Sequence, residues 1–431
     1  MPYVTTLLPR LRPRGPAPHT RAGTVCGALL LLAIGAACGG DESTGPLPTA
    51  GCPAASGATP SNALTVLGCG DFRPSRTTAE ITVRGNTAYT TTWGNPSGIG
   101  SAFYIWDVTG DAPTLVDSVL VDNARTLGDV AVSDDGAYLF VATEQVGALA
   151  VYSLADPRKP VLVNRYTSAE ILPGVHTAEI ARVNGKLYGF LAIDPGASPA
   201  KLVIVDLGNP GSPQPVFSQF IGTPYVHDTF VRDGILFLAL WNAGVAVWDI
   251  GGGGKGGTPA SPVELGRLQT ANGEVHNIWW FKDPATGSAK YAFIGEEGPS
   301  NIGVSALGDI HVVDVSNMGS PREVAFYTVG GAGTHNFSMD EANGILYAAY
   351  YNGGVRALDV RGDLGTCTDA QKSSPQSQTV KLCDLSKMGR EKAVGLKDRD
   401  RVSIWGVQFL SGAVYASDMS NGIWKLQAVS R

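Results

Sequence analysis

One recurring spacing constrains the fold of this chain more than any other feature. Acidic and amide residues start a series of apolar runs at intervals of 49, 50, 49 and 49 residues, at Glu80, Asp129, Glu179, Asp228 and Asn277. Asn336 and Gly406 continue the series at wider spacing. A period of roughly 40–50 residues with strand chemistry inside it is typical of one propeller blade per repeat.

Each repeat has the same internal order. Three short runs rich in Val, Ile and aromatic residues are bounded by Gly, Asp and Asn, and a fourth run follows a turn containing proline. This is the pattern of strands joined by tight turns. Seven copies predict an all-β protein, a seven-bladed β-propeller with four-stranded blades.

The ring must close, because an open propeller leaves an unpaired sheet edge. The last repeat supplies only three runs before Arg431, whereas "ALTVLG" at residues 63–68 resembles a fourth strand and precedes the first repeat. We therefore expect this N-terminal strand to complete the last blade, so that the propeller covers residues 63–431.

The third run of the repeats carries a family resemblance. "KLVIVDL" at residues 201–207, with "GVAVWDI" and "DIHVVDV" as variants, resembles the LVIVD repeat proteins of bacterial and archaeal envelopes. The resemblance extends over residues 80–427 and implies a propeller fold. Ser153 and Gln427 depart from it, since the other repeats place Asp there.

The N-terminus has the pattern of an export signal. Four arginines precede the apolar run "VCGALLLLAI" and the small residues "GAAC", which predicts a signal peptide over residues 1–37. Cys38 and the small residues before it resemble the lipobox of bacterial lipoproteins, although Gly35 departs from that pattern. Gly39 after the cysteine resembles the residue found there in proteins sent to the outer membrane. We expect lipidation of Cys38, a polar tether over 38–62 and a membrane partner through the anchor. The alternative is ordinary secretory cleavage with Cys38 incidental.

Charge and cysteine content agree with an exported protein. The formal net charge is −6, and loss of the four leader arginines makes the remainder more acidic, which argues against a nucleic-acid partner. Four cysteines remain beyond Cys38, an even number. We expect disulfides Cys52–Cys69 and Cys367–Cys383. Zinc binding is the alternative, but the cysteines lack CxxC spacing.

Two other motifs are weaker. The stretch "GGGGKGGT" at residues 251–258 lacks the Ser or Thr that a P-loop needs after its Lys, so we interpret it as a flexible turn. Glu296 and Glu297 form a carboxylate pair at a strand end. Such pairs are more often solvated charges than acid/base catalysts.

Histidines at one register position form the candidate site. His176, His227, His276 and His335 lie at or beside the start of the first strand in four successive repeats. The first strand of a blade is innermost, so the four imidazoles should point toward one axis. Imidazoles without thiolate suit a single transition metal such as Fe, Cu or Zn, with Glu179, Asp228, Asn277 and Asn336 as orienting partners. Alternatively, each His is a hydrogen-bonded structural residue inherited by duplication.

Two classes of function follow. The first is a lipid-anchored binding or scaffold module of the cell envelope, with a protein or small-molecule ligand at the propeller face. The second is a metal-dependent oxidoreductase with a four-His site, an arrangement similar in architecture and ligand type to carotenoid cleavage oxygenases and to selenium-binding methanethiol oxidases. Five aromatic residues are candidates for an apolar mouth or for blade packing: Trp241, Trp279, Trp280, Trp405 and Tyr225.

Overall fold

A computed structural model describes residues 52–70, 76–94, 100–193, 200–221, 225–270, 273–300 and 306–430. These residues belong to one compact unit, Pro48–Arg431. The expected signal peptide at 1–37, the lipidation site Cys38 and the first part of the expected tether lie outside the described residues. Within the described part, no helix is long and apolar enough to span a membrane.

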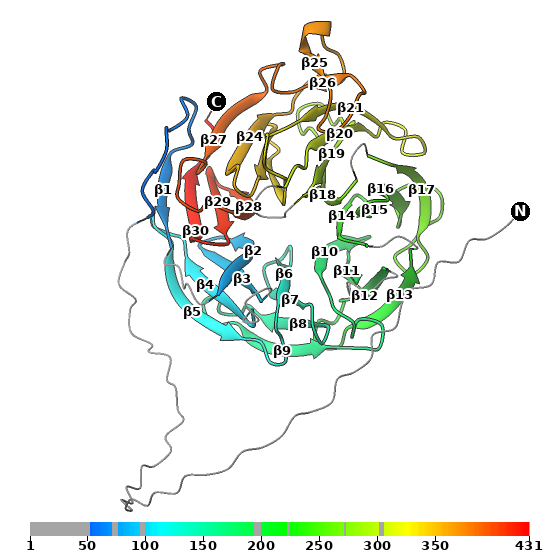
Figure 1. The fold of residues 1–431 in the computed structure, drawn as a ribbon. Coiled ribbons are helices and arrows are strands. Elements are labelled where there is room, and N and C mark those ends of the chain that lie inside the picture. The colour runs from blue at the N-terminus through cyan, green and yellow to red at the C-terminus, as the bar shows by residue number, and fades with distance from the viewer. Residues whose placement is uncertain are drawn as a thin grey trace, which may run out of the picture. The chain divides into compact units, whose positions relative to one another are not determined.

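The expected seven-bladed β-propeller is confirmed. Seven sheets surround a common centre, as Figure 1 shows, and in each sheet the three innermost strands follow one another outward in chain order and pair antiparallel. Neighbouring inner strands contact one another around the whole ring, including β2 with β28, the first and the last.

The blades are numbered in chain order, and their strands have the following bounds. Blades one to three contain β2 (Thr77–Arg84), β3 (Thr87–Trp93), β4 (Ala102–Asp107), β5 (Thr114–Leu120); β6 (Leu127–Val132), β7 (Tyr138–Thr143), β8 (Ala148–Ser153), β9 (Val161–Tyr166); β10 (Thr177–Val183), β11 (Lys186–Ile193), β12 (Lys201–Asp206) and β13 (Gln214–Phe220). Blades four and five contain β14 (Asp228–Arg232), β15 (Ile235–Ala239), β16 (Val245–Asp249), β17 (Val263–Leu268); β18 (Val275–Trp280), β19 (Tyr291–Glu296), β20 (Ile310–Asp314) and β21 (Arg322–Tyr327). Blades six and seven contain β22 (Phe337–Asp340), β23 (Ile345–Ala349), β24 (Val355–Asp359), β27 (Glu391–Gly395); β28 (Ile404–Leu410), β29 (Ala413–Asp418) and β30 (Gly422–Gln427).

The N-terminal strand closes the ring as expected. β1 (Val66–Cys69) pairs antiparallel with β30 and is the outer strand of blade seven. The Cys52–Cys69 disulfide joins this strand to the segment before it. Part of the expected tether also contacts the propeller, since Ser56 N donates to Asp398 O at 2.8 Å and Arg399 Nη1 donates to Pro53 O at 3.0 Å.

Blade five departs from the expected four strands. The insertion between β24 and β27 contains a short 3₁₀ helix (Asp369–Gln371), β25 (Lys372–Ser373) and β26 (Leu382–Asp384). β26 pairs in parallel with β21, which extends this blade to six strands. The expected Cys367–Cys383 disulfide closes the insertion. Sequence periodicity does not register these two strands because they lie outside the repeat.

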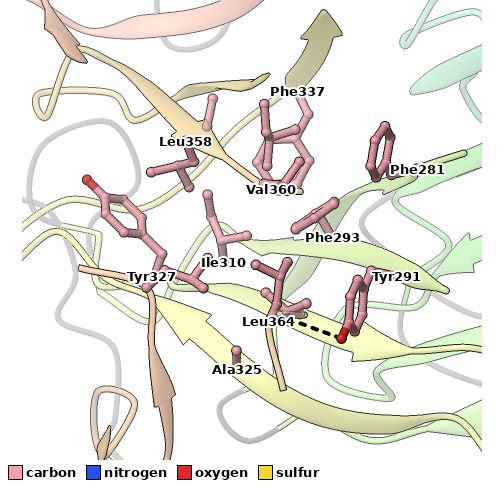
Figure 2. Packing of buried hydrophobic residues seen from close by; sticks show 14 of the residues in the cluster. Phe281, Tyr291, Phe293, Ile310, Ala325, Tyr327, Phe337, Leu358, Val360 and Leu364 are labelled. Atoms are coloured by element: carbon pink, nitrogen blue, oxygen red, sulfur yellow. Dashed lines mark hydrogen bonds between the residues drawn. The ribbon is translucent and has the colours of Figure 1, made fainter. Parts of the chain in front are cut away.

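Apolar side chains fill the spaces between neighbouring blades rather than one central core. Figure 2 shows the layer between blades five and six, where Phe293 and Ile310 face Phe337 and Leu358. Leu364 from the insertion is fully buried in the same layer, and its backbone N–H donates to the Tyr291 hydroxyl at 3.2 Å. Burial of one such side chain contributes about 1.5–3 kcal/mol. This packing fixes each inner strand, and therefore fixes what it presents to the central channel.

Candidate metal centre at one end of the channel

The four predicted histidines meet at one end of the propeller channel. His276 is in β18, His176 and His227 directly precede β10 and β14, and His335 lies two residues before β22. They come from blades three to six, and the blade packing places the equivalent position of each inner strand beside the next.

The imidazoles form a continuous arc. Ring centroids are 4.4 Å apart between His176 and His227, 4.1 Å between His227 and His276, and 4.0 Å between His276 and His335. The Nε2 atoms of His176 and His227 are 3.1 Å apart. Two nitrogens bound to one metal ion at about 2.0–2.1 Å are separated by a similar distance.

A carboxylate orients the first imidazole of the arc. The Nδ1 atom of His176 lies 3.0 Å from Glu144 Oε1, and Glu144 directly follows β7 in blade two. A carboxylate on one ring nitrogen fixes the tautomer and directs the other nitrogen, here Nε2, toward the arc.

A second carboxylate joins the arc from blade five. Glu297 directly follows β19, is 4% exposed, and places Oε2 4.0 Å from His276 Nε2. His227, His276 and Glu297 each offer one ligand atom, and the three atoms lie within 4.8 Å of one another. The Tyr351 hydroxyl donates to Glu297 Oε1 and orients the carboxylate. The chain therefore contains a His/Glu group with the composition of a transition-metal site.

The electrostatics keep three of the four imidazoles neutral. Burial, and then the neighbouring imidazoles, hold the pKa of His227, His276 and His335 well below the usual value. The Nδ1 atoms of these rings are buried without a hydrogen-bond partner. Burial is also the main cause that raises the pKa of Glu297 to about 7. Unpaired buried nitrogens cost free energy, and a neutral imidazole is the form that binds metals.

Aromatic rings support the arc. Trp241 stacks on His227 with centroids 4.9 Å apart, and Trp405 packs against His335 at 4.3 Å. Trp241 and Tyr351 have positive φ angles of 52° and 39° and each forms a backbone bridge to the next inner strand. Such strained backbone is maintained only where the surroundings determine it, and it clusters at functional sites.

The five aromatic residues singled out in the sequence have different roles. Tyr225 packs on Trp241 near the arc, at 5.8 Å, and Trp405 also lines the channel. Trp279 lines the channel beyond the arc. Trp280 instead packs on Phe237 between blades, which is the alternative that the sequence left open.

The acid and amide series one layer further along the channel connects neighbouring blades. Asp129 Oδ2 accepts from the Ala178 N–H at 2.8 Å, and Asn277 Nδ2 donates to Asp228 Oδ2 at 3.2 Å. Asp228 and Asn277 therefore do not orient the imidazole rings as expected. Their side chains instead form hydrogen bonds that connect neighbouring blades. Orientation of His176 comes from Glu144, which the sequence analysis did not identify.

Gly406 has a steric reason to be the glycine of the series. Glu80 reaches across blade seven, where its carboxylate accepts from the Asn336 side chain of blade six. A Cβ atom at Gly406 would lie 2.4 Å from Glu80 Oε1. Blade seven has no side chain at Gly406 because the Glu80 side chain of blade one occupies that space.

Two expectations about other motifs change. The glycine stretch is an ordered anion-binding turn, since the N–H groups of Gly251, Gly253 and Lys255 donate to the Asp249 carboxylate at 2.7–2.8 Å. Burial opposes ionisation of Asp249, but these backbone donors lower its pKa to about 2. The Glu296 and Glu297 pair is buried rather than solvated.

Glu296 belongs to a separate buried group. His311 in β20 lies between Glu296, with Nε2 and Oε2 2.9 Å apart, and Glu323, with Nδ1 and Oε1 2.6 Å apart. Burial disfavours charge on His311, yet the two carboxylates raise its pKa well above the usual value. His311 is thus paired within blade five and is outside the imidazole arc.

Comparisons with known proteins found one family model and similar solved structures. The LVIVD repeat model matches residues 197–219 and 304–329, which contain β12 and the β20–β21 pair. No curated protein matches the chain. The crystal structure of Saccharomyces cerevisiae Sqt1 is similar with a TM-score of 0.53 at 11% identity, covering 85% of this chain and 86% of that chain. The C-terminal WD40 domain of Sif2 has a TM-score of 0.49 at 10% identity, covering 82% of each chain. The likeness to Sqt1 concerns the fold alone, and the chain is a seven-bladed β-propeller that carries LVIVD repeats.

Proposed function

We propose that this propeller is a lipid-anchored module of the cell envelope that binds one transition-metal ion at the imidazole arc. The observation that carries the metal proposal is the group formed by His227, His276 and Glu297, whose ligand atoms lie within 4.8 Å of one another. His176 and His335 flank this group at the two ends of the arc without belonging to it, and the metal proposal keeps them as further candidate ligands.

The donor set selects the class of metal. Neutral imidazoles with one carboxylate suit Fe, Cu or Zn, whereas a hard ion such as Ca²⁺ takes six to eight oxygen ligands. The described cysteines are all in disulfides and provide no thiolate. Glu144 and Tyr351 hold the donors at the two sides of the arc, which reduces the cost of ordering them when an ion binds.

The anchor proposal rests on the leader and on Cys38. A charged segment, an apolar run and small residues precede this cysteine, and two disulfides in the remaining chain suit an oxidising compartment such as the envelope. A diacylated Cys38 would hold the propeller at a membrane, in our proposal the outer membrane, with a face free to bind a protein or a small molecule.

A metal-dependent oxidoreductase is the second candidate, and one observation favours it. His176, His276 and His335 line a cavity of about 430 Å³, so a second molecule has space next to the proposed ion. A redox-active ion such as Fe or Cu would supply electron-transfer chemistry there. The residues of the chain would hold the ion at the cavity wall.

Metal analysis of the protein purified without a histidine tag tests the proposal. We expect about one ion per chain from the coordination by one His/Glu group, and loss of that ion in His276→Ala and Glu297→Gln. Asp400→Asn is the matched control, because Asp400 is a carboxylate with 69% of its side chain exposed. Protein that stays metal-free after reconstitution with Fe, Cu and Zn would contradict the metal site. The proposed function would then be that of a binding module alone.

A further inference from the structure

The cavity beyond the imidazole arc has a chemistry of its own. It occupies about 430 Å³ between the inner strands, which is within the roughly 300–1,000 Å³ usual for small-molecule sites. Its walls carry four carboxyl side chains, one from each of the first four blades: Glu80, Asp129, Glu179 and Asp228.

The positively charged side chain in the cavity wall already has an ion-pair partner and a hydrogen-bond partner. Arg232 is the one lysine or arginine among the described lining residues. Its Nη1 atom lies 2.7 Å from Glu341 Oε1 and donates to Trp280 O at 2.6 Å. Arg232 also acts on Glu179 through its charge, but no ion pair joins a lysine or arginine of the described residues to any of the four carboxyl groups.

The acids are too far apart to bind one ion directly. Among the described residues, the His227, His276 and Glu297 group is the one in which three ligand atoms of His, Cys, Asp or Glu lie within 4.8 Å. The cavity carboxylates do not converge in this way, so their arrangement suits an extended cation with several hydrogen-bond donors.

Unpartnered acceptors in the wall point to the same kind of ligand. Asn277 is 8% exposed, its Nδ2 atom donates to Asp228, and its Oδ1 atom is buried without a partner. Thr229 is 4% exposed and its hydroxyl also has no partner. Asp228 Oδ1 accepts one backbone N–H, from Thr229 at 2.7 Å, and each carboxylate oxygen has a further lone pair.

We infer that this cavity binds a small organic ammonium ion, such as an alkyl diamine. An ammonium group supplies three donors and a positive charge, which match the unpaired Asn277 oxygen and the carboxylates. Phe230 and Trp279 line the same cavity with their ring centroids 5.4 Å apart, and the Arg232 guanidinium lies over both rings, so they offer their remaining apolar surface to the alkyl chain. The binding does not require the proposed metal ion.

Calorimetric titration of the metal-free protein with 1,4-diaminobutane tests the inference. The titration is done at low salt and about pH 9, where alkylammonium groups remain charged. We expect saturable binding of the diamine and none of 1-butanol or butanoate. Because the protein is stripped of metal, failure of the proposed metal function leaves this result unchanged.

Three variants locate the binding. Asp228→Asn should weaken it about tenfold or more, since a hydrogen bond to a charged group contributes about 1.5–3 kcal/mol. Thr229→Val has almost the same shape and breaks no hydrogen bond of the hydroxyl, so it should fold normally and weaken binding by about 3-fold to 10-fold. Asp400→Asn should have no effect. Absence of diamine binding, equal binding of 1-butanol, or affinity unchanged in both Asp228→Asn and Thr229→Val would overturn the inference.

Discussion

Substitution of Gly406 by alanine should destabilise the propeller by acting on the contact between its first, sixth and seventh blades. The added Cβ would lie 2.4 Å from Glu80 Oε1 and 2.9 Å from Ile81 Cγ2, closer than real Cβ contacts allow. Glu80 cannot move away freely. Its Oε1 atom accepts from the Ile81 N–H at 2.9 Å, and its Oε2 atom accepts from Asn336.

The magnitude follows from these contacts. An extra carbon in a packed interior costs about 1–3 kcal/mol, and a buried donor or acceptor left without its hydrogen-bond partner costs about 1–3 kcal/mol. We expect a total of about 4 kcal/mol from these two effects. For a unit of the length Pro48–Arg431, the entropy of unfolding is about 0.8 kcal/mol/K, so the melting temperature should fall by about 5 °C.

Scanning calorimetry of a double-mutant cycle separates this mechanism from a general loss of packing. Glu80→Ala alone removes the bonds to Ile81 and Asn336 and should also destabilise the protein. In the Glu80→Ala background, Gly406→Ala should cost less, because the closest of its clashes is absent while the one with Ile81 remains. Gly330→Ala is the control, since nothing lies within 4 Å of a Cβ there. A wild-type melting temperature for Gly406→Ala, or additive effects of the two substitutions, would refute the reasoning.

Three further predictions concern charge, the anchor and closure. Burial is the largest cause that raises the pKa of Glu179 to about 8, so the stability from its bound proton is complete below its unfolded pKa and is lost as pH rises through about 8. Glu179→Gln should therefore reduce the loss of stability that the metal-free protein undergoes between about pH 5 and 8. The reduction should be at most about 3 kcal/mol, because the cavity admits water. Thermal melts measure it, and an unchanged pH profile of the melting temperature would contradict the prediction. Cys38→Ser should move the protein from the membrane fraction to the soluble fraction, and its retention in membranes would count against the lipid anchor. Deletion of residues 38–70 removes β1 and exposes the edge of β30, so we expect aggregation or a large loss of stability, which a soluble variant with unchanged melting would exclude.

The repeat spacing was sufficient to predict the ring, its closing strand and the shared position of four histidines. Each of these depends on local strand chemistry and on one residue per repeat, which a period in the sequence preserves. The approach of His176 and His227 to 3.1 Å follows from that position, because packed blades bring equivalent residues of neighbouring inner strands together. Both disulfides were predictable because each pairs cysteines near in sequence, 17 and 16 residues apart.

The partners of the imidazoles were not predictable from the period. Glu144 and Glu297 follow the second strand of their blades, so they have no counterpart in the register of the histidines. The glutamate pair at the end of β19 was visible in the sequence, but only the fold shows that Glu297 turns toward His276 while Glu296 pairs with His311. The role of Gly406 was likewise hidden, because the side chain that fills its space comes from the opposite end of the chain.

The two proposed sites should oppose each other, because both would hold positive charge along one channel. His176, His276 and His335 belong to the imidazole arc and also line the cavity, so no further layer of residues separates the two ligands. Like charges in one channel repel each other, and more strongly than in bulk water because the surrounding protein lowers the effective dielectric constant. We expect the zinc-loaded protein to bind 1,4-diaminobutane severalfold more weakly than the metal-free protein, and the diamine to reduce zinc affinity by the same factor, since coupling between two sites is reciprocal. Titration of each ligand in the presence of the other measures both factors. Tighter diamine binding to the zinc-loaded protein would show that the two ligands do not occupy adjacent parts of the channel as free cations.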